Sequence, residues 1–145
     1  MTNFKLTIGF IFLSLCFNQA YGQTDPLKTN WNNLIIGKWV KKISKTENGE
    51  KYDGLKCLDT IEYYNDGRYV WNMCGIMESG KWEISKERSV IIFRERDNKY
   101  WKKELNLTDL GEMESPLFKL SETELVTRMI DEEKGWINEF YYRIK

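Results

Sequence analysis

The sequence predicts an all-β protein, a small antiparallel up-and-down β-barrel preceded by a short helical lead-in. Segments that alternate apolar and polar residues recur at short spacing, roughly eight to ten of them, and no long helical period interrupts them. Short turns separate most of these segments, which favours a meander over the long crossovers of a Greek key. Closure of the sheet into a barrel also removes the exposed strand edges that promote aggregation.

The expected elements follow one another along the chain. Residues 25–35 are expected to form a short helical or irregular lead-in, in which Asp25-Pro26 suits a helix start. Asn48-Gly49 predicts a type I′ turn that joins a strand over 36–47 to a short strand over 50–52. The remaining strands are expected in the hairpin 57–74, at 79–85, in a hairpin over 89–96 and 99–107, as two strands in 116–130, and at 135–144.

The segment "CLDTIEYYNDGRYVWNMC" predicts a hairpin clamped by a disulfide between Cys57 and Cys74. Its central Asn-Asp-Gly fits a type I turn followed by a glycine bulge, which brings the two cysteines opposite or diagonal to each other. A metal site would need further ligands, and the chain has no histidine. A redox pair would normally be Cys-x-x-Cys, which is absent. Two unpaired thiols are the remaining alternative.

Residues 1–22 have the features of an export signal. Lys5 provides the positive start, and the apolar run "LTIGFIFLSLCF" is short for a membrane span. The small residues of "AYG" predict cleavage before Gln23, which leaves 23–145 as one domain. A lipoprotein acylated at Cys16 is the competing interpretation, although Leu15 precedes that cysteine where a small residue is expected. We therefore expect a bacterial protein that is periplasmic or secreted, where a disulfide persists.

Charge and composition exclude several classes of function. Lysines and arginines equal aspartates and glutamates in number, and the two signs are interspersed along the chain. No basic stripe indicates a nucleic-acid partner, and residues 23–145 contain no segment typical of a membrane span. We expect a monomer without a cofactor.

The residue inventory argues against an enzyme. Without histidine, the chain cannot form Ser-His or Cys-His arrangements or most zinc sites. A disulfide would leave no thiolate. Paired carboxylates are the remaining catalytic option, and none lies in a sequence context that indicates a raised pKa. No catalytic residue and no metal ligand is predicted.

Four motifs in order carry a resemblance to a known family. They are "LIIGKWVKK" at 34–42, "DGRYVWN" at 66–72, "GKWEIS" at 80–85 and "LSETELVTR" at 120–128. The Gly37-x-Trp39 opening of the first strand resembles the start of a lipocalin, and the chain as a whole resembles the short lipocalin-like domains that bacteria export. The resemblance implies that Trp39 plugs one end of the barrel and that an arginine of a late strand, Arg143 or Arg128, packs across it through a cation–π contact.

The aromatic content suggests a binding function. The whole chain contains six tryptophans and eight tyrosines, a high aromatic load, and most of them are expected to fill the barrel interior. Four aromatic residues are the candidates for lining a ligand pocket: Trp71, Trp82, Trp101 and Phe140. The predicted function is therefore non-enzymatic binding of a small hydrophobic or amphipathic molecule. The alternative is a solid barrel whose outer surface recognises a protein or glycan partner.

Overall fold

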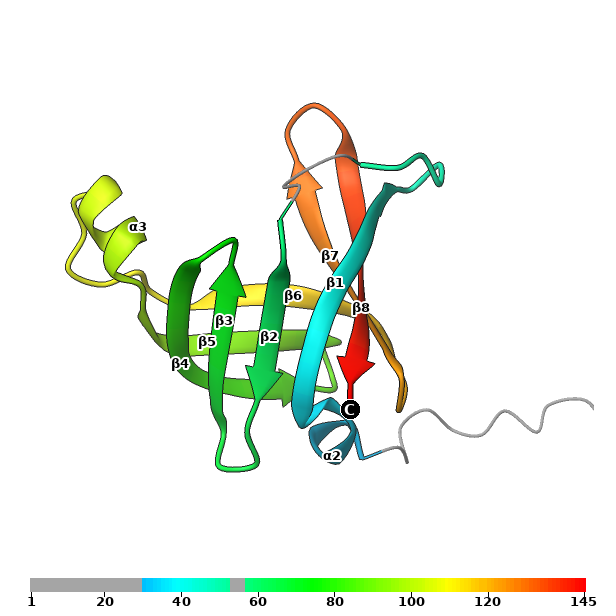
Figure 1. Cartoon of the computed structure of the whole chain (residues 1–145), viewed down its shortest axis with the longest axis horizontal. Helices are drawn as coiled ribbons and strands as arrows, with labels where there is room; N and C mark the ends of the chain where they lie inside the picture. Colours follow the sequence, from blue (N-terminus) through cyan, green and yellow to red (C-terminus); the bar gives the residue numbers. More distant parts are fainter. Residues whose placement is uncertain (1–29, 53–56) are drawn as a thin grey trace, which may run out of the picture.

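The computed structural model shows an eight-stranded antiparallel barrel (Figure 1). It describes residues 30–52 and 57–145. Each strand pairs with the next along the chain, and β8 pairs with β1 to close the barrel. The predicted all-β, up-and-down barrel is therefore confirmed. The expected signal peptide, Cys16, the cleavage before Gln23 and the helix start at Asp25-Pro26 lie outside the described residues.

Two short helices accompany the strands. The elements in order are α2 (Trp31–Ile35), β1 (Gly37–Thr46), β2 (Asp59–Tyr63), β3 (Arg68–Met73), β4 (Ile76–Ser85), β5 (Val90–Asp97), α3 (Lys99–Glu104), β6 (Met113–Leu120), β7 (Glu124–Asp131) and β8 (Gly135–Ile144). Within the described residues, no helix has the length and apolar character needed to cross a membrane.

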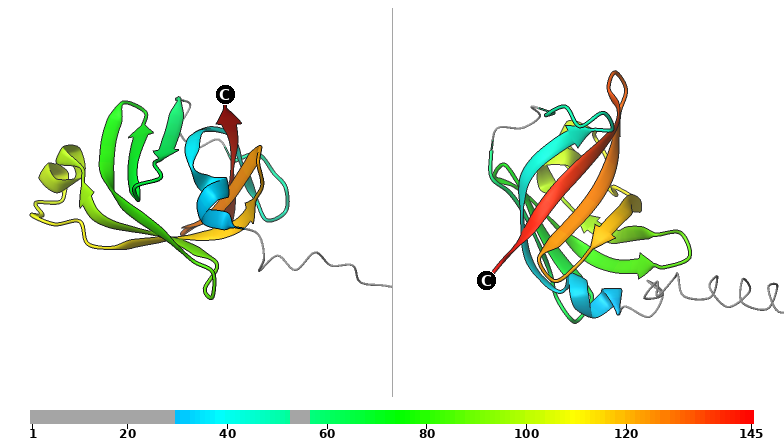
Figure 2. Two further views of the ribbon diagram at one scale, coloured as in Figure 1. Left: turned by 90° about the horizontal axis from the view of Figure 1, so that it is seen from below. Right: turned by 90° about the vertical axis from the view of Figure 1, so that its right-hand side faces the viewer.

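The strand connections define two ends of the barrel (Figures 1 and 2). At one end, the α2 end, lie α2 and the β2–β3 turn. At the other, the disulfide end, lie the Cys57–Cys74 bond and the β7–β8 turn. The Cα atoms of Cys57 and Cys74 are 5.2 Å apart, and the predicted disulfide is confirmed. The turn of this hairpin has Gly67 at φ 82° and a hydrogen bond from Gly67 N–H to Tyr64 O, as a type I turn with a glycine bulge requires.

The prediction of a strand over 99–107 is wrong. Residues Lys99–Glu104 form the helix α3, and the antiparallel partner of β5 is β6. Asn98 begins the helix as its N-cap, because its side chain accepts a hydrogen bond from Trp101 N–H. The following lysines and glutamate favour helix in this segment once the cap is formed.

The expected type I′ turn at Asn48-Gly49 is also wrong. Of these two residues only Gly49 has a positive φ, 83°, whereas a type I′ turn needs positive φ at both. Gly49 N–H donates to Thr46 O, so the turn is built from Thr46 to Gly49. The short strand expected over 50–52 is reduced to one bridge, Lys45 with Lys51.

Aromatic and aliphatic side chains fill the α2 end and the middle of the barrel. The buried core comprises Ile35, Trp39, Ile61, Tyr63, Tyr69, Ile91, Phe93, Leu117, Leu125 and Tyr141. Phe93 lies at its centre, with ring centroids 4.8 Å from Tyr69 and 6.3 Å from Tyr63. Alternation along the strands places these residues on the inner face, so this part of the barrel is a packed core.

Trp39 and Arg143 close the α2 end. Trp39 is fully buried, and its indole N–H donates to Ile35 O at 2.7 Å. The Arg143 guanidinium lies 4.4 Å from the Trp39 ring centroid and donates to the Ile36 and Leu34 carbonyls. The other arginine considered for this position, Arg128, stacks on Phe118 instead.

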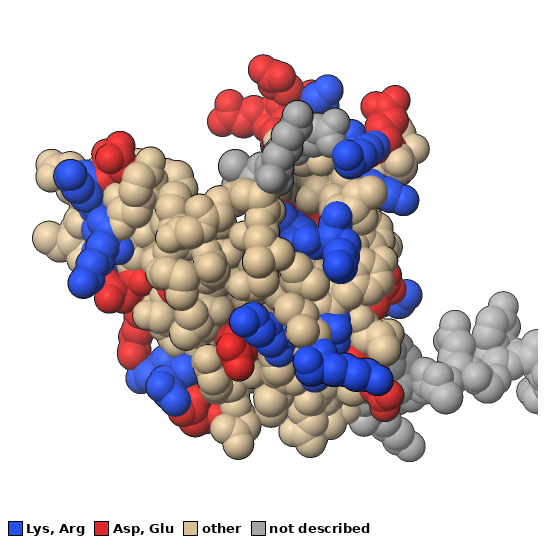
Figure 3. All heavy atoms as spheres, in the orientation of Figure 1, with Lys and Arg blue, Asp and Glu red and all other residues tan. Residues whose placement is uncertain are grey.

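Figure 3 shows that lysine and arginine side chains gather along β1 on the outside of the barrel.

Candidate functional site

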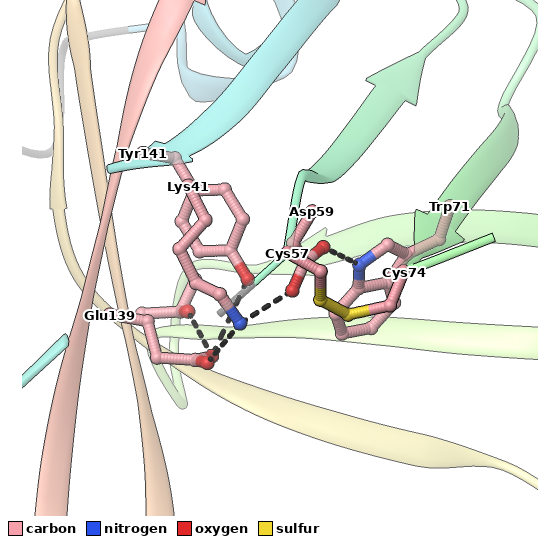
Figure 4. Close-up of polar contacts among 8 residues, drawn as sticks. Lys41, Cys57, Asp59, Trp71, Cys74, Glu139 and Tyr141 are labelled. Atoms are coloured by element: carbon pink, nitrogen blue, oxygen red, sulfur yellow. Dashed lines mark hydrogen bonds and ion pairs between the residues drawn. A yellow bond between two sulfur atoms is a disulfide. The ribbon is translucent and has the colours of Figure 1, made fainter. Parts of the chain in front are cut away.

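A cluster of polar side chains lies inside the disulfide end of the barrel (Figure 4). We call it the Lys41 cluster; it comprises Lys41, Asp59, Trp71, Glu139 and Tyr141. Lys41 follows the buried Trp39 by two residues in β1 and therefore points into the barrel. The other four come from β2, β3 and β8, so four strands contribute to one site.

Lys41 bridges two carboxylates. Its Nζ lies 2.5 Å from Asp59 Oδ2 and 3.1 Å from Glu139 Oε1. The exposed fractions of the three side chains are 16% for Lys41, 2% for Asp59 and 11% for Glu139. Burial alone would lower the pKa of Lys41, but the Glu139 charge and the hydrogen bond and charge of Asp59 outweigh it and raise the pKa. The ammonium is therefore held in its charged form.

Trp71 and Tyr141 complete the cluster. The Trp71 indole N–H donates to Asp59 Oδ1 at 2.6 Å, and the Tyr141 hydroxyl donates to Glu139 Oε2 at 3.5 Å. Complete burial, together with the nearby Glu139 charge, raises the pKa of Tyr141 well above its ordinary value. Each carboxylate is thus bonded to Lys41 on one oxygen and to an aromatic side chain on the other.

The rim of the disulfide end is held by a second contact. The Tyr52 hydroxyl donates to Asp131 Oδ2 at 2.8 Å, and Asp131 Oδ1 accepts from the backbone N–H groups of Glu133 and Lys134. The hydrogen bond to Asp131 raises the pKa of Tyr52. This contact joins the segment after β1 to the β7–β8 turn.

The four aromatic residues expected to line a pocket are not brought together. Trp71 lies at the disulfide end, with its ring 5.9 Å from Phe93. Trp82 also points inward but lies toward the α2 end, where its indole N–H donates to Tyr64 O at 3.2 Å. Its ring packs edge-on against Tyr63 at 5.4 Å.

Trp101 and Phe140 lie outside the barrel. Trp101 is on α3, 37% exposed, with its ring against Tyr100. Phe140 alternates with the inward Glu139 and Tyr141 and therefore faces outward, where Lys45 lies 5.8 Å from its ring centroid. Neither side chain is in a position to line the interior, because one belongs to the α3 insertion and the other to the outer face of β8.

A second buried charge cluster anchors α3 to the barrel. The Glu78 carboxylate is completely buried and accepts from Arg96 Nε and Nη2 at 2.9 and 3.0 Å. It also accepts from the Tyr69 hydroxyl and from Asn98 Nδ2. Burial alone would lower the pKa of Arg96, but the hydrogen bond and the charge of Glu78 outweigh it and raise this pKa above its ordinary value. Because Asn98 also caps α3, this cluster connects the helix to the core.

The described residues contain no metal-binding arrangement. Among them, no group of three or more Cys, Asp or Glu side chains is placed to hold an ion. Every buried side-chain nitrogen and oxygen atom in the described part of the chain has a hydrogen-bond partner.

This architecture is lipocalin-like: eight antiparallel strands in sequence order form a closed barrel with a helix at one end. Barrels of this size hold either packed side chains or one small ligand.

No family model and no curated protein matches the sequence. A lipocalin-like protein from Bacteroides uniformis is similar in structure, with a TM-score of 0.48 and 11% identity over 76% of this chain and 98% of that one. A redesigned β-barrel is similar with a TM-score of 0.47 and 10% identity over 81% of this chain and 98% of that one. The lipocalin-like description therefore depends on the strand order and barrel closure of this chain.

Proposed function

We propose that this protein is a non-enzymatic, exported binding protein that holds one small hydrophobic or amphipathic molecule inside the disulfide end of its barrel. The ligand would lie against Trp71 with its polar group toward the Lys41 cluster. The packed core around Phe93 limits its size, because the α2 half of the interior is already filled.

One observation carries this proposal. Lys41 and Trp71 point into a closed barrel, yet both side chains remain partly exposed. Inner-face groups of a small barrel are normally buried by their neighbours, so partial exposure at this end supports an interior that is accessible from outside. An indole ring beside a charged, hydrogen-bonding group is also the composition of a pocket that orients an amphipathic ligand.

Export is part of the same proposal. A disulfide persists outside the reducing cytoplasm, and the bond between Cys57 and Cys74 supports an extracytoplasmic location. We propose cleavage before Gln23, with acylation of Cys16 as the alternative; the intact mass of the processed protein distinguishes them.

The alternative function, a solid barrel that recognises a macromolecule, is favoured by a different observation. The hydrogen bonds of the Lys41 cluster are satisfied within the cluster itself, so its polar atoms need no ligand. Under this alternative, the cluster is a structural bridge between β1, β2 and β8.

Titration with an apolar fluorescent probe separates the two functions. We expect saturable binding with micromolar affinity, about −8 kcal/mol, and quenching of tryptophan emission. Trp71→Ala should weaken binding at least about tenfold, a loss of about 1.4 kcal/mol. Trp82→Ala is the matched control, since Trp82 is also inward-facing but lies toward the other end; it should lower stability and leave the affinity of the remaining folded protein nearly unchanged. A titration that stays linear to high probe concentration would support the solid barrel instead.

A further inference from the structure

The outer side of β1, β8 and β7 forms a continuous face, which we call the β1–β8–β7 face (Figure 2, right). Trp39, Glu139 and Tyr141 point into the barrel. The strand register and the alternation of side chains place the residues of this face on the other, outer side of the sheet. Its outward residues are Lys38, Val40, Ile43 and Lys45 of β1, Trp136, Asn138, Phe140, Tyr142 and Ile144 of β8, and Glu124, Val126, Arg128 and Ile130 of β7, with Phe118 of β6 at its margin.

Large apolar side chains are exposed together on this face. Their exposed fractions are 69% for Ile130, 62% for Phe118, 43% for Ile144, 39% for Trp136 and 38% for Tyr142. Ile130 and Trp136 are direct cross-strand neighbours. Single exposed apolar residues are ordinary, but a contiguous group on one face is typical of an interaction surface.

The outward strand positions of this face carry three cations, Lys38, Lys45 and Arg128, although the whole chain has no net charge. Lys45 lies over the Phe140 ring, and Arg128 stacks on Phe118 with 4.1 Å between guanidinium carbon and ring centroid. Within the described residues neither cation pairs with a carboxylate; Arg128 Nε donates to Asn138 Oδ1. Lys and Arg side chains are visible along β1 in Figure 3.

Three acidic residues, Asp131, Glu132 and Glu133, lie at one end of this surface, where β7 turns into β8. Among the outward positions of β1, β7 and β8, Glu124 is the one carboxylate, and it forms an ion pair with Lys119 of β6. Lys38 of β1 lies opposite Glu62 of the neighbouring strand. Lys45 and Arg128 both lie opposite Asn138 of β8 and therefore place positive charge on the strand surface beside Phe140 and Phe118.

We propose that the β1–β8–β7 face binds peripherally to an anionic phospholipid membrane. Tryptophan, tyrosine and phenylalanine favour the boundary between lipid headgroups and acyl chains, and lysine and arginine are attracted to anionic headgroups. The exposed Ile130 and Trp136 at the β7–β8 hairpin would enter this boundary, while Lys45 and Arg128 contact phosphate groups.

Two other partners fit the face less well. A soluble polyanion would use the cations but would gain nothing from burying Ile130 or Ile144. A protein partner that adds a β-strand needs an unpaired sheet edge, and the barrel has none because β8 pairs with β1. The membrane accounts for both the charge and the apolar exposure.

Vesicle sedimentation tests the proposal on the processed, exported protein, whose intact mass first shows that it carries no acyl group. We expect the protein to sediment with vesicles of phosphatidylcholine mixed with phosphatidylglycerol, not with phosphatidylcholine alone, and to be released by salt. Lys45→Gln combined with Arg128→Gln should weaken the partition on the order of tenfold. Ile130→Ser combined with Trp136→Ser should weaken it without changing the salt dependence.

The α3 insertion provides a matched control. Lys99→Gln combined with Lys103→Gln removes two exposed cations near Tyr100 and Trp101, far from the face (Figure 1), and should leave the partition unchanged. The proposal is overturned if the protein fails to sediment with the anionic vesicles. It is also overturned if the α3 pair and the Lys45/Arg128 pair lower the partition equally, or if a soluble polyanion binds while vesicles do not.

Discussion

Trp39 and Arg143 hold the α2 end of the barrel through contacts that depend on each other. The indole is anchored to the Ile35 carbonyl, and the guanidinium covers the ring and donates to the backbone of the α2–β1 connection. Gly37 makes room for this arrangement. It has φ 126°, and a Cβ atom at this position would lie 2.8 Å from Arg143 Nη1.

Replacing Trp39 by alanine should therefore destabilise the fold strongly. We expect a loss of about 3–5 kcal/mol in the free energy of unfolding, as for a large aromatic side chain removed from a packed core. A denaturant melt followed by circular dichroism measures it. An unchanged midpoint would mean that Trp39 is not a structural plug.

The Lys41 cluster should depend on the charge of Lys41 for its stability. Lys41→Met should cost about 3–5 kcal/mol near neutral pH, because it leaves the buried Asp59 and Glu139 carboxylates without their cation.

The pH dependence has a definite sign. Since the pKa of Lys41 is raised in the folded protein, its contribution is fully present below its ordinary pKa and is lost as the pH rises through the folded value. The difference between wild type and Lys41→Met should thus be constant from neutral pH to about pH 10 and shrink above it. Thermal melts of wild type and Lys41→Met across this pH range measure the difference. A difference that does not shrink as the pH rises through the alkaline range would contradict the assignment.

Sequence reasoning could find some of these residues but not the cluster. A signal was available for Lys41, because it shares the inner face of β1 with Trp39, two residues earlier. Its partner Glu139 is 98 residues away. Only barrel closure between β1 and β8 brings the two together, and strand alternation alone does not determine which inward residues meet.

At the scale of elements, the clamped hairpin follows from local sequence, whereas α3 does not. The β2–β3 turn is determined by Asn65-Asp66-Gly67, so its geometry could be predicted. The segment 99–107 combines aromatic residues, which favour strands, with lysines and leucines, which favour helix. The helix forms because Asn98 caps it and bonds to buried Glu78, and the second of these contacts is tertiary.

The disulfide between Cys57 and Cys74 should stabilise the folded protein. Replacing Cys57 and Cys74 by serine should lower stability by about 3 kcal/mol, the chain-entropy value for closing a loop of this size. Reduced wild-type protein provides the control and should melt like the double variant. Equal melting of the oxidised protein and the double variant would show that the bond contributes nothing to the stability of the hairpin.

For the whole molecule, the barrel separates two regions with different properties. The α2 half is a packed aromatic core, and the disulfide end holds a charged cluster that is partly exposed. The order of strands could be predicted from short turns alone, because sequential antiparallel strands leave little choice of topology. The distribution of aromatic residues between the inside and the outside of the barrel could not be predicted in this way. Which side a residue faces depends on bulges such as those within the β1–β8 and β4–β5 pairings.

Native mass spectrometry of the exported protein, purified without detergent, tests the central claim most directly. We predict a population whose mass exceeds that of the processed chain by one small organic molecule. The same adduct should be absent from Trp71→Ala and present in Trp82→Ala. A bare chain mass in all three proteins, together with lipid extracts that contain no stoichiometric compound, would contradict the account of a ligand held inside the barrel.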